Sequence, residues 1–418
     1  MGPVEVTRIP GVRQYVSLFW RENERMRAGP LPARPRSILL VRLSARGDIV
    51  FSSPLVRALR RTFPDARLTW MAESHTKDLM EHHPELDDLI VVERHEWKGL
   101  WKQRRFGDLF RALETFLRDL RSRDFDVALD LQGLLRSGIL TYLSGASVRL
   151  GLGSKEGSRM FMTRVVPRDR GDPRKISSEY RYLAEELGLE VGDFAMEVPL
   201  APADREWARD RVRELGLEGG FLVAVPFTTR PQKHWFEDRW ARLMDRVAQE
   251  IGLPTVVLGG PGDEGAFQRI RGMARIEPVS LVGKTNLTQA GAMIERAALV
   301  IGVDTGLSHM GIAFRRPTVA IFGSTIPYSE PPTDRAKVLV HRLACSPCRG
   351  NPTCDGDFTG LRLVTVDEVM AAAQEVLAKG ELEGIRKKEF SAPPVVAADP
   401  GSHGAPEEVR GHSGDRLP

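Results

Sequence analysis

Short apolar runs alternate with helical stretches along most of the chain, and this alternation restricts the fold more than any other feature. Each run is aliphatic and ends at turn-forming residues, which predicts buried strands at 37–43, 68–72, 89–92, 127–131, 221–225, 255–258, 299–303 and 318–322. Helices are expected between them, notably at 54–63, 109–121, 177–187, 237–250 and 288–298. Strands that alternate with helices form parallel sheets covered on both faces. The chain is therefore predicted to be an α/β protein built from two Rossmann-like halves.

The 418 residues exceed what one ordinary core accommodates, so two domains are expected. The sequence predicts a basic N-terminal arm at 1–36, a first domain at 37–196, a second domain at 197–384 and a tail at 385–418. The linker between the domains is expected within Glu197–Asp204. The tail is rich in Pro, Gly, Ala and Ser and is expected to be disordered.

Charge and hydropathy favour a cytoplasmic protein. No apolar run is long enough to span a bilayer, no signal peptide is recognisable, and only three cysteines occur. The net charge is +4, and residues 1–36 alone hold seven Arg and three Glu. The remainder is balanced, which argues against a nucleic-acid-binding stripe. The arm spaces Val12, Tyr15, Val16 and Phe19 along one helical face, which either packs on the first domain or makes a peripheral contact with the inner membrane.

The first polar cluster follows the strand at 37–43. It contains Ser44, Arg46, Gly47 and Asp48. Ligands of open parallel sheets bind at the carboxyl ends of strands, so such clusters are candidate sites. Asp48 stands where a helix begins, and two interpretations stay open: a helix cap or a general base that faces a cleft.

The clusters of the second half suit a diphosphate. After the strand at 221–225, the hydroxyls of Thr228 and Thr229 and the ammonium of Lys233 could bind phosphate, or could belong to a solvated loop. After the strand at 299–303, small residues open a helix whose N-terminus favours an anion. The candidate residues there are Asp304, Thr305, Gly306, Leu307 and His309. Asp263 and Glu264, after a glycine turn, could hold ribose hydroxyls or form a plain loop.

Several other site classes are excluded by spacing. The chain lacks GxxxxGK[ST] and HExxH, residues 151–157 miss the GxGxxG spacing, and 306–310 lack the second Gly of GxSxG. Cys345, Cys348 and Cys354 could bind zinc only with a fourth ligand, for which His341 is nearest. Free thiols are favoured, and no metal or cofactor is predicted.

Taken in order, these clusters resemble glycosyltransferase family 9, the heptosyltransferases of lipopolysaccharide inner-core synthesis. The resemblance covers about residues 37–378. Its motifs are Ser44 to Asp48 followed by Ser53-Pro54, the segment 130–137 (DLQGLLRS), Thr228-Thr229 with Lys233-His234-Trp235, and the segment 304–309 (DTGLSH).

The resemblance implies a GT-B fold, in which two Rossmann-like domains face a central cleft. It implies that the second half binds ADP-heptose and the first half an anionic glycolipid acceptor. Asp48 would be the base of a metal-independent, inverting transfer, and Lys233 with the 304–309 turn would hold the donor diphosphate. The acceptor contacts expected in this way are Arg136, Arg104, Arg105, Ser44 and Gly47.

Two positions depart from the family pattern: Arg46 replaces a residue that is more often apolar, and a further Cys expected near 362–364 is absent. Three alternatives remain beside heptose transfer. They are a related transferase with another nucleotide sugar or surface-glycan acceptor, a nucleotide-sugar epimerase, and a non-catalytic protein that binds nucleotide sugars.

Overall fold

The first sheet is built from the aliphatic runs of the N-terminal half. The computed structural model describes residues 31–390 apart from 154, 169, 347, 349–353 and 355, with side chains to residue 379. Within these residues the sheet is parallel, has the order β3-β2-β1-β4-β5-β6, and aligns Ile38 with Leu68 and Val127. Its strands are β1 (Ser37–Val41), β2 (Arg67–Glu73), β3 (Asp88–Val92), β4 (Val127–Asp130), β5 (Val148–Leu152) and β6 (Arg164–Val166).

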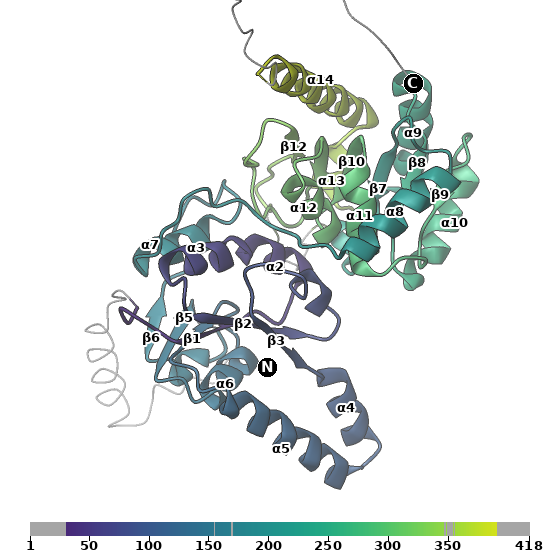
Figure 1. Cartoon of the computed structure of the whole chain (residues 1–418). Helices are drawn as coiled ribbons and strands as arrows, with labels where there is room; N and C mark the ends of the chain where they lie inside the picture. The colour runs from purple at the N-terminus through teal and green to yellow at the C-terminus, as the bar shows by residue number, and fades with distance from the viewer. Residues whose placement is uncertain are drawn as a thin grey trace, which may run out of the picture. The chain divides into compact units, whose positions relative to one another are not determined.

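The second sheet repeats this plan in the C-terminal half. It is parallel, has the order β12-β11-β10-β7-β8-β9, and aligns Val300 with Val223 and Thr318. Its strands are β7 (Leu222–Val225), β8 (Thr255–Val257), β9 (Val279–Ser280), β10 (Leu299–Val303), β11 (Thr318–Ile321) and β12 (Ala336–Leu339). We call the two sheets with their helices the N-terminal and C-terminal lobes (Figure 1).

Helices connect successive strands in both lobes. Those of the N-terminal lobe are α2 (Arg46–Ser52), α3 (Pro54–Thr62), α4 (Arg94–Lys102), α5 (Phe106–Ser122), α6 (Leu135–Leu143) and α7 (Ser178–Glu186). Those of the C-terminal lobe are α8 (Pro202–Glu214), α9 (Glu237–Arg246), α10 (Glu264–Met273), α11 (Leu287–Arg296), α12 (Gly306–Ala313), α13 (Thr359–Leu363) and α14 (Val366–Phe390). Short 3-10 turns lie at Ser158–Phe161 (η3) and Pro231–Lys233 (η4). None of the described helices is long and apolar enough to cross a membrane.

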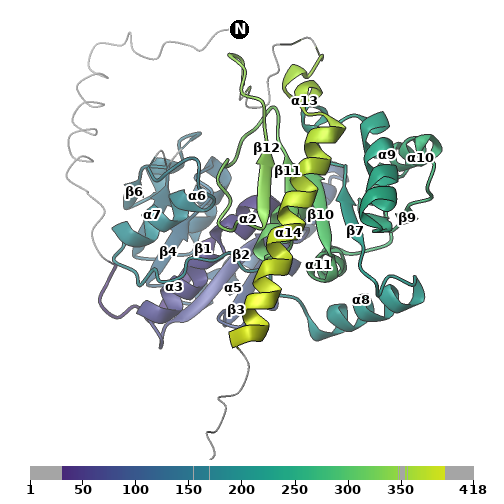
Figure 2. The same cartoon turned by 90° about the horizontal axis from the view of Figure 1, so that it is seen from above.

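Side-chain alternation along β1 determines how the first sheet is covered. Ile38 and Leu40 pack with the buried side chains of α2, α3 and α7, whereas Leu39 and Val41 face Leu120 of α5 on the other side. Because successive strand residues point to opposite faces, a run of buried residues requires helices on both sides. Figure 2 shows α14 running across one face of the second sheet, and its buried side chains pack on β10 and β11.

The predicted strands are confirmed, although their ends differ by one or two residues. The predicted linker Glu197–Asp204 runs into the first turn of α8, which Pro202 begins, and its role as a linker stays a prediction. The domain boundary near residue 196 stays a prediction. The apolar face predicted for Val12 to Phe19 and most of the predicted tail lie outside the described residues.

Candidate active site

A cleft of about 1450 Å³ lies between the carboxyl ends of the two sheets. The N-terminal lobe contributes the loop after β1 and the start of α2, and the C-terminal lobe contributes the loops after β7, β8, β10 and β11. The two lobes belong to one compact unit that extends to Gly380. Most of the site residues predicted from the sequence therefore meet in one cavity, as expected for parallel sheets.

Asp48 lines this cleft from the third position of α2. Its Oδ2 accepts a hydrogen bond from Ala45 N at 3.3 Å and lies 2.5 Å from Nη2 of the buried Arg42. Arg42 is fixed in turn, because its Nη1 donates to the carbonyl oxygen of Leu131 at 2.7 Å. The Asp48 side chain is still 42% exposed. Asp48 therefore both caps the start of α2 and presents its carboxylate to the cleft.

Lys233 and Asp304 face each other on the opposite side of the cleft. Lys233 ends η4, and its Nζ lies 2.6 Å from Asp304 Oδ2. The hydroxyl of Thr325 also donates to Asp304 Oδ2. His309 places Nε2 3.4 Å from Asp304 Oδ1, and its Nδ1 lies 2.9 Å from the hydroxyl of Tyr328. Asp304 is thereby the centre of a network that fixes the Lys233 ammonium.

Asp304 is an anion held in a buried position. Its side chain is only 8% exposed. Burial by itself raises the pKa of this carboxyl, but the hydrogen bond and charge of His309 and the ion pair with Lys233 outweigh it and leave the pKa well below its ordinary value. Asp304 therefore stays charged at any pH near neutrality.

The two lobes approach each other closely where α2 and α12 begin. A Cβ added at Gly47 would lie 2.8 Å from His309 Cδ2, and one added at Gly306 would lie 2.8 Å from Arg46 Cβ. Phe51 of α2 also packs on the His309 ring, with ring centroids 4.6 Å apart. Glycine at both positions permits this approach because it carries no Cβ. The starts of both helices consequently border the same part of the cleft.

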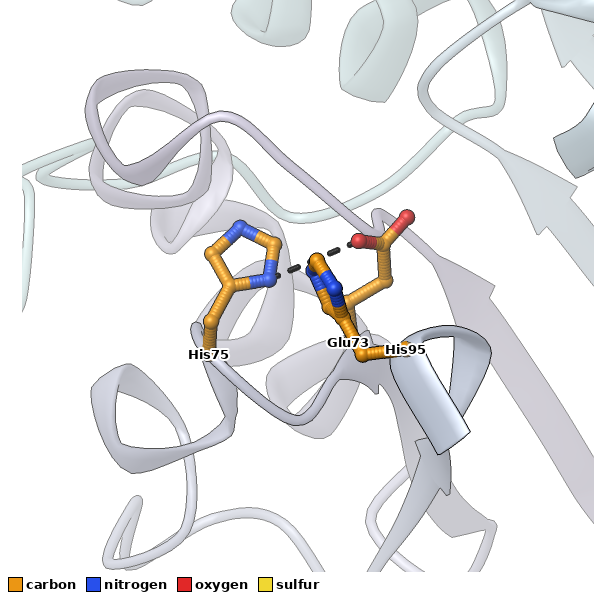
Figure 3. Close-up of side chains that lie close together, drawn as sticks. All are labelled: Glu73, His75 and His95. Carbon is orange, nitrogen blue, oxygen red and sulfur yellow. Dashed lines mark ion pairs between the residues drawn. The ribbon is translucent and has the colours of Figure 1, made fainter. Parts of the chain in front are cut away.

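A second polar cluster lies beside Ser44, around a buried carboxylate at the end of β2. Glu73 is about 3% exposed, and its Oε1 lies 3.0 Å from Arg136 Nη1. Arg136 also donates through Nη2 to Ser44 Oγ at 2.9 Å, which connects this cluster to the cleft. His75 Nδ1 lies 3.4 Å from the other Glu73 oxygen, and His95 completes the group (Figure 3).

The charge around the cluster favours an anion over a metal ion. Glu73, His75 and His95 offer three ligand atoms within 4.8 Å of one another, as a metal site requires. However, Arg136 and Arg94 both lie near the Glu73 carboxylate. Burial lowers the pKa of His75, and the nearby charges of Arg46, His95 and Arg136 lower it further against the opposing effect of Glu73. A positively charged environment of this kind repels a cation.

The sequence interpretation missed Glu73, His75 and His95. No local motif marks them, and their partners are distant in sequence. One signal was available: Glu73 ends β2 and His95 follows β3, so both obey the same strand-end rule that selected the other clusters.

Four predicted residues are not brought into the cleft; Arg136 is the first, and only its hydrogen bond to Ser44 connects it to the lining. Arg104 and Arg105 lie at the turn between α4 and α5, where Arg105 Nε pairs with Asp108 Oδ2 at 2.7 Å. Glu264 begins α10 and accepts a hydrogen bond from Gln268. None of these four is among the described residues that line the cleft. Arg104 and Arg105 lie outside the cleft because α4 carries the chain away from the end of β3, whereas Glu264 stands next to the lining residue Asp263 without lining the cleft itself. Asp263 does line the cleft, and Gly260 N donates to its carboxylate at 2.8 Å.

The cysteines do not form a metal cluster in the described part of the chain. Cys345, Cys348 and Cys354 are free thiols that border a small separate cavity. His341, the nearest candidate for a fourth ligand, instead places Nε2 3.0 Å from Glu368 Oε2. Among the described residues, only Glu73, His75 and His95 bring three ligand atoms together.

Comparison with known proteins gives a consistent result. The model of glycosyltransferase family 9 (heptosyltransferase) matches residues 113–357. Lipopolysaccharide heptosyltransferase 1 of Pseudomonas aeruginosa is 26% identical over 81% of this chain and 99% of its own length. Among solved structures, the family 9 glycosyl transferase of Veillonella parvula is 24% identical, with a TM-score of 0.70 over 84% of this chain and 99% of that one.

A second solved structure, ADP-heptose lps heptosyltransferase II of Escherichia coli, is 21% identical with a TM-score of 0.64, over 82% of this chain and 99% of that one. Both structures align along almost their whole length. The predicted GT-B arrangement of two Rossmann-like halves is confirmed by this likeness.

Proposed function

Because this chain belongs to glycosyltransferase family 9, the heptosyltransferases, we propose that it transfers a heptose from ADP-heptose to the inner core of lipopolysaccharide. The acceptor would be lipid A that carries Kdo, or a core that already carries heptose. One observation carries the site: Asp48 from one lobe and Lys233 from the other line the same cleft. A base on the acceptor side and a cation on the donor side are the two groups that such a transfer requires.

The donor diphosphate is proposed to bind between the loop after β7 and the start of α12. Thr228 and Thr229 can donate hydrogen bonds there, and Lys233 supplies a positive charge. The N-terminus of α12 adds a favourable potential for an anion. Asp304 holds the Lys233 ammonium in position, while Asp263 lies where ribose hydroxyls could bind.

The proposed reaction is a single displacement with inversion. Asp48 accepts the proton of the acceptor hydroxyl while that oxygen bonds to the anomeric carbon of the heptose. The bond from this carbon to the diphosphate oxygen breaks, and its electron pair leaves with ADP. Lys233, Thr228 and Thr229 stabilise the charge that develops on the diphosphate. The chemistry assigned to these residues uses no metal.

The acceptor is proposed to bind on the side of Ser44 and Gly47, where Arg136, Arg94 and His75 surround the buried Glu73 and Arg46 lies near His75. Glu73 neutralises one guanidinium, which leaves a net positive charge. A carboxylate or phosphate of an anionic glycolipid is complementary to this charge.

Mass spectrometry of a transfer reaction tests the proposal. The protein is incubated with ADP-heptose and Kdo-bearing lipid A, and the expected result is a lipid heavier by one heptose with an equal amount of ADP. If product forms with another nucleotide sugar but not with ADP-heptose, the donor is that other nucleotide sugar. Conversion of ADP-heptose without acceptor would identify an epimerase, and binding without turnover would identify a non-catalytic protein.

A further inference from the structure

The α4–α5 hairpin, residues 94–122, carries aromatic side chains that the other described residues leave uncovered. We propose that the end of this hairpin docks on the surface of a bilayer that contains anionic phospholipid. Trp101, Phe106 and Phe110 are 63%, 52% and 69% exposed. Trp101 and Phe106 also contact each other, with ring centroids 5.3 Å apart, so the exposed rings form a patch. Uncovered apolar patches of this kind mark interaction sites.

The base of the hairpin is part of the core, whereas its end is not. Trp97 packs edge-on against Phe116 at a centroid distance of 5.1 Å, and Leu120 is buried beneath the first sheet. Figure 1 shows α4 and α5 extending from that sheet, with the turn between them at the far end. The exposed aromatic side chains therefore belong to two helices whose other ends pack in the core of the N-terminal lobe.

Positive charge surrounds the aromatic patch. Residues 98–111 contain five basic side chains and one acidic side chain, a net charge of +4. The basic residues are Lys98, Lys102, Arg104, Arg105 and Arg111, and all five are exposed. The single acid, Asp108, is already paired with Arg105 and Arg111 at 2.7 and 2.5 Å. Lys98, Lys102 and Arg104 thus present charge to a partner.

Exposed aromatic rings within a ring of cations match the chemistry of a bilayer surface. Tryptophan and phenylalanine enter the boundary between headgroups and acyl chains, while lysine and arginine bind the anionic headgroups around them. A second copy of the same patch fits less well, because two identical surfaces of charge +4 repel each other. Charge complementarity therefore favours an anionic membrane.

The hairpin lies near the proposed acceptor side of the cleft, as a lipid-linked acceptor would require. The membrane-docking inference does not depend on that acceptor. His95, in the first turn of α4, belongs to the cluster around Glu73. Docking by the hairpin would hold that cluster, and the acceptor side of the cleft, near the membrane. Vesicles without any glycolipid test docking alone, so failure of this inference and failure of the proposed transfer reaction are distinguishable.

Co-sedimentation of the full-length protein with vesicles tests the inference. One vesicle preparation contains phosphatidylcholine and phosphatidylglycerol, and the other phosphatidylcholine alone. The wild type is expected to bind the anionic vesicles, and added salt is expected to weaken binding. The triple variant Trp101→Ser, Phe106→Ser, Phe110→Ser should lose about tenfold or more in the partition coefficient. Lys98→Gln with Lys102→Gln should lose about fivefold for each charge removed.

Matched controls use exposed residues of the C-terminal lobe. Met273→Ser removes an exposed apolar side chain, and Arg209→Gln with Arg213→Gln removes two exposed charges from α8. Both controls should bind vesicles like the wild type, and thermal unfolding checks that every variant is folded.

Three outcomes would overturn the inference. The first is wild-type binding by both hairpin variants. The second is loss of binding only when Phe19 and Trp20 of the N-terminal arm are replaced by Ser in the full chain. The third is a protein that ignores vesicles but dissociates from dimer to monomer, by light scattering, when the three aromatic residues are replaced.

Discussion

Asp48 and Asp304 are both carboxylates at strand ends, but their surroundings suit them to different tasks. Asp304 is buried and holds an ammonium, a hydroxyl and an imidazole. Asp48 is exposed to the cleft, and both of its described contacts use the same oxygen, Oδ2. A general base must be reachable by the proton that it accepts. This contrast supports Asp48 as the base and Asp304 as the residue that positions Lys233.

Asp48→Asn tests that distinction. Loss of a general base is expected to lower kcat by about 10²- to 10⁴-fold, because the amide cannot accept the proton of the acceptor hydroxyl. The Kd for ADP-heptose, measured by calorimetry, should change little, since the donor contacts come from the other lobe. Turnover close to that of the wild type would remove Asp48 from the mechanism.

Asp304→Asn should change how stability depends on pH. The folded-state pKa of Asp304 lies below the unfolded value of about 3.9, so its contribution is present above that pH and is lost as the pH falls through the folded pKa. Breaking the buried pair with Lys233 is expected to cost about 3 kcal/mol at neutral pH. Urea unfolding at a series of pH values should show this difference shrink only below about pH 4, where the unfolded carboxyl becomes protonated. A constant difference would contradict the ion-pair explanation.

At the scale of elements, the sequence predicts strands well where they are central and aliphatic. β1 and β7 (SILLV and LVAV) are fully buried and were identified as apolar runs. The missed strands β5, β6, β9 and β12 lie toward sheet edges and are short, or contain Arg or Lys. Their side chains face solvent in part, so hydropathy alone does not reveal them.

Site residues, like strands, could be predicted from the sequence where they follow central aliphatic strands. Asp48, Lys233 and Asp304 follow recognisable central strands, so their position could be predicted from the sequence. Glu73 could not be paired with Arg136 in advance, because that contact depends on how β2 and α6 are placed in three dimensions. Arg104 and Arg105 lie away from the cleft because they stand at the far end of the α4–α5 hairpin, whose length the sequence does not reveal, and their contact with the acceptor stays a prediction.

Because the starts of α2 and α12 are in close contact, adding one methyl group there is expected to destabilise the fold. In Gly306→Ala the new Cβ would lie 2.8 Å from Arg46 Cβ and 3.4 Å from Gly47 N. Such overpacking is expected to cost about 1–3 kcal/mol in the free energy of unfolding. Gly265→Ala in α10 is the control, because its nearest neighbour lies at 3.9 Å and alanine favours helices. Equal stability of Gly306→Ala and the wild type would show that the lobes separate there easily.

At the scale of the whole molecule, both lobes line the cleft, but the proposed donor contacts come from the C-terminal lobe. A ligand that binds only the folded protein stabilises it according to its concentration. ADP should therefore stabilise the protein through the C-terminal lobe even when no acceptor is present.

ADP at 100 times its Kd is expected to raise the free energy of unfolding by about 2.7 kcal/mol. Lys233→Ala should lose most of this gain at the same ADP concentration, because the diphosphate loses its cation. Lys284→Ala, which removes another lysine of the same lobe, should behave like the wild type. Denaturant titration with and without ADP measures both values, and equal gains in all three proteins would place the diphosphate elsewhere.

Arg42 has a consequence for how such a protein could diversify. It ties Asp48 to the backbone of Leu131, next to the centre of the first sheet, and not to the loops after β2 and β3. Side chains of those loops that do not contact Asp48 or Arg42, such as His75 and His95, can therefore be exchanged to admit acceptors of other shapes while the proposed base keeps its orientation, provided that Thr76 keeps its hydrogen bond to Leu43. A library that randomises His75 and His95 but retains Arg42 would yield variants that accept new acceptors while Asp48 stays in place.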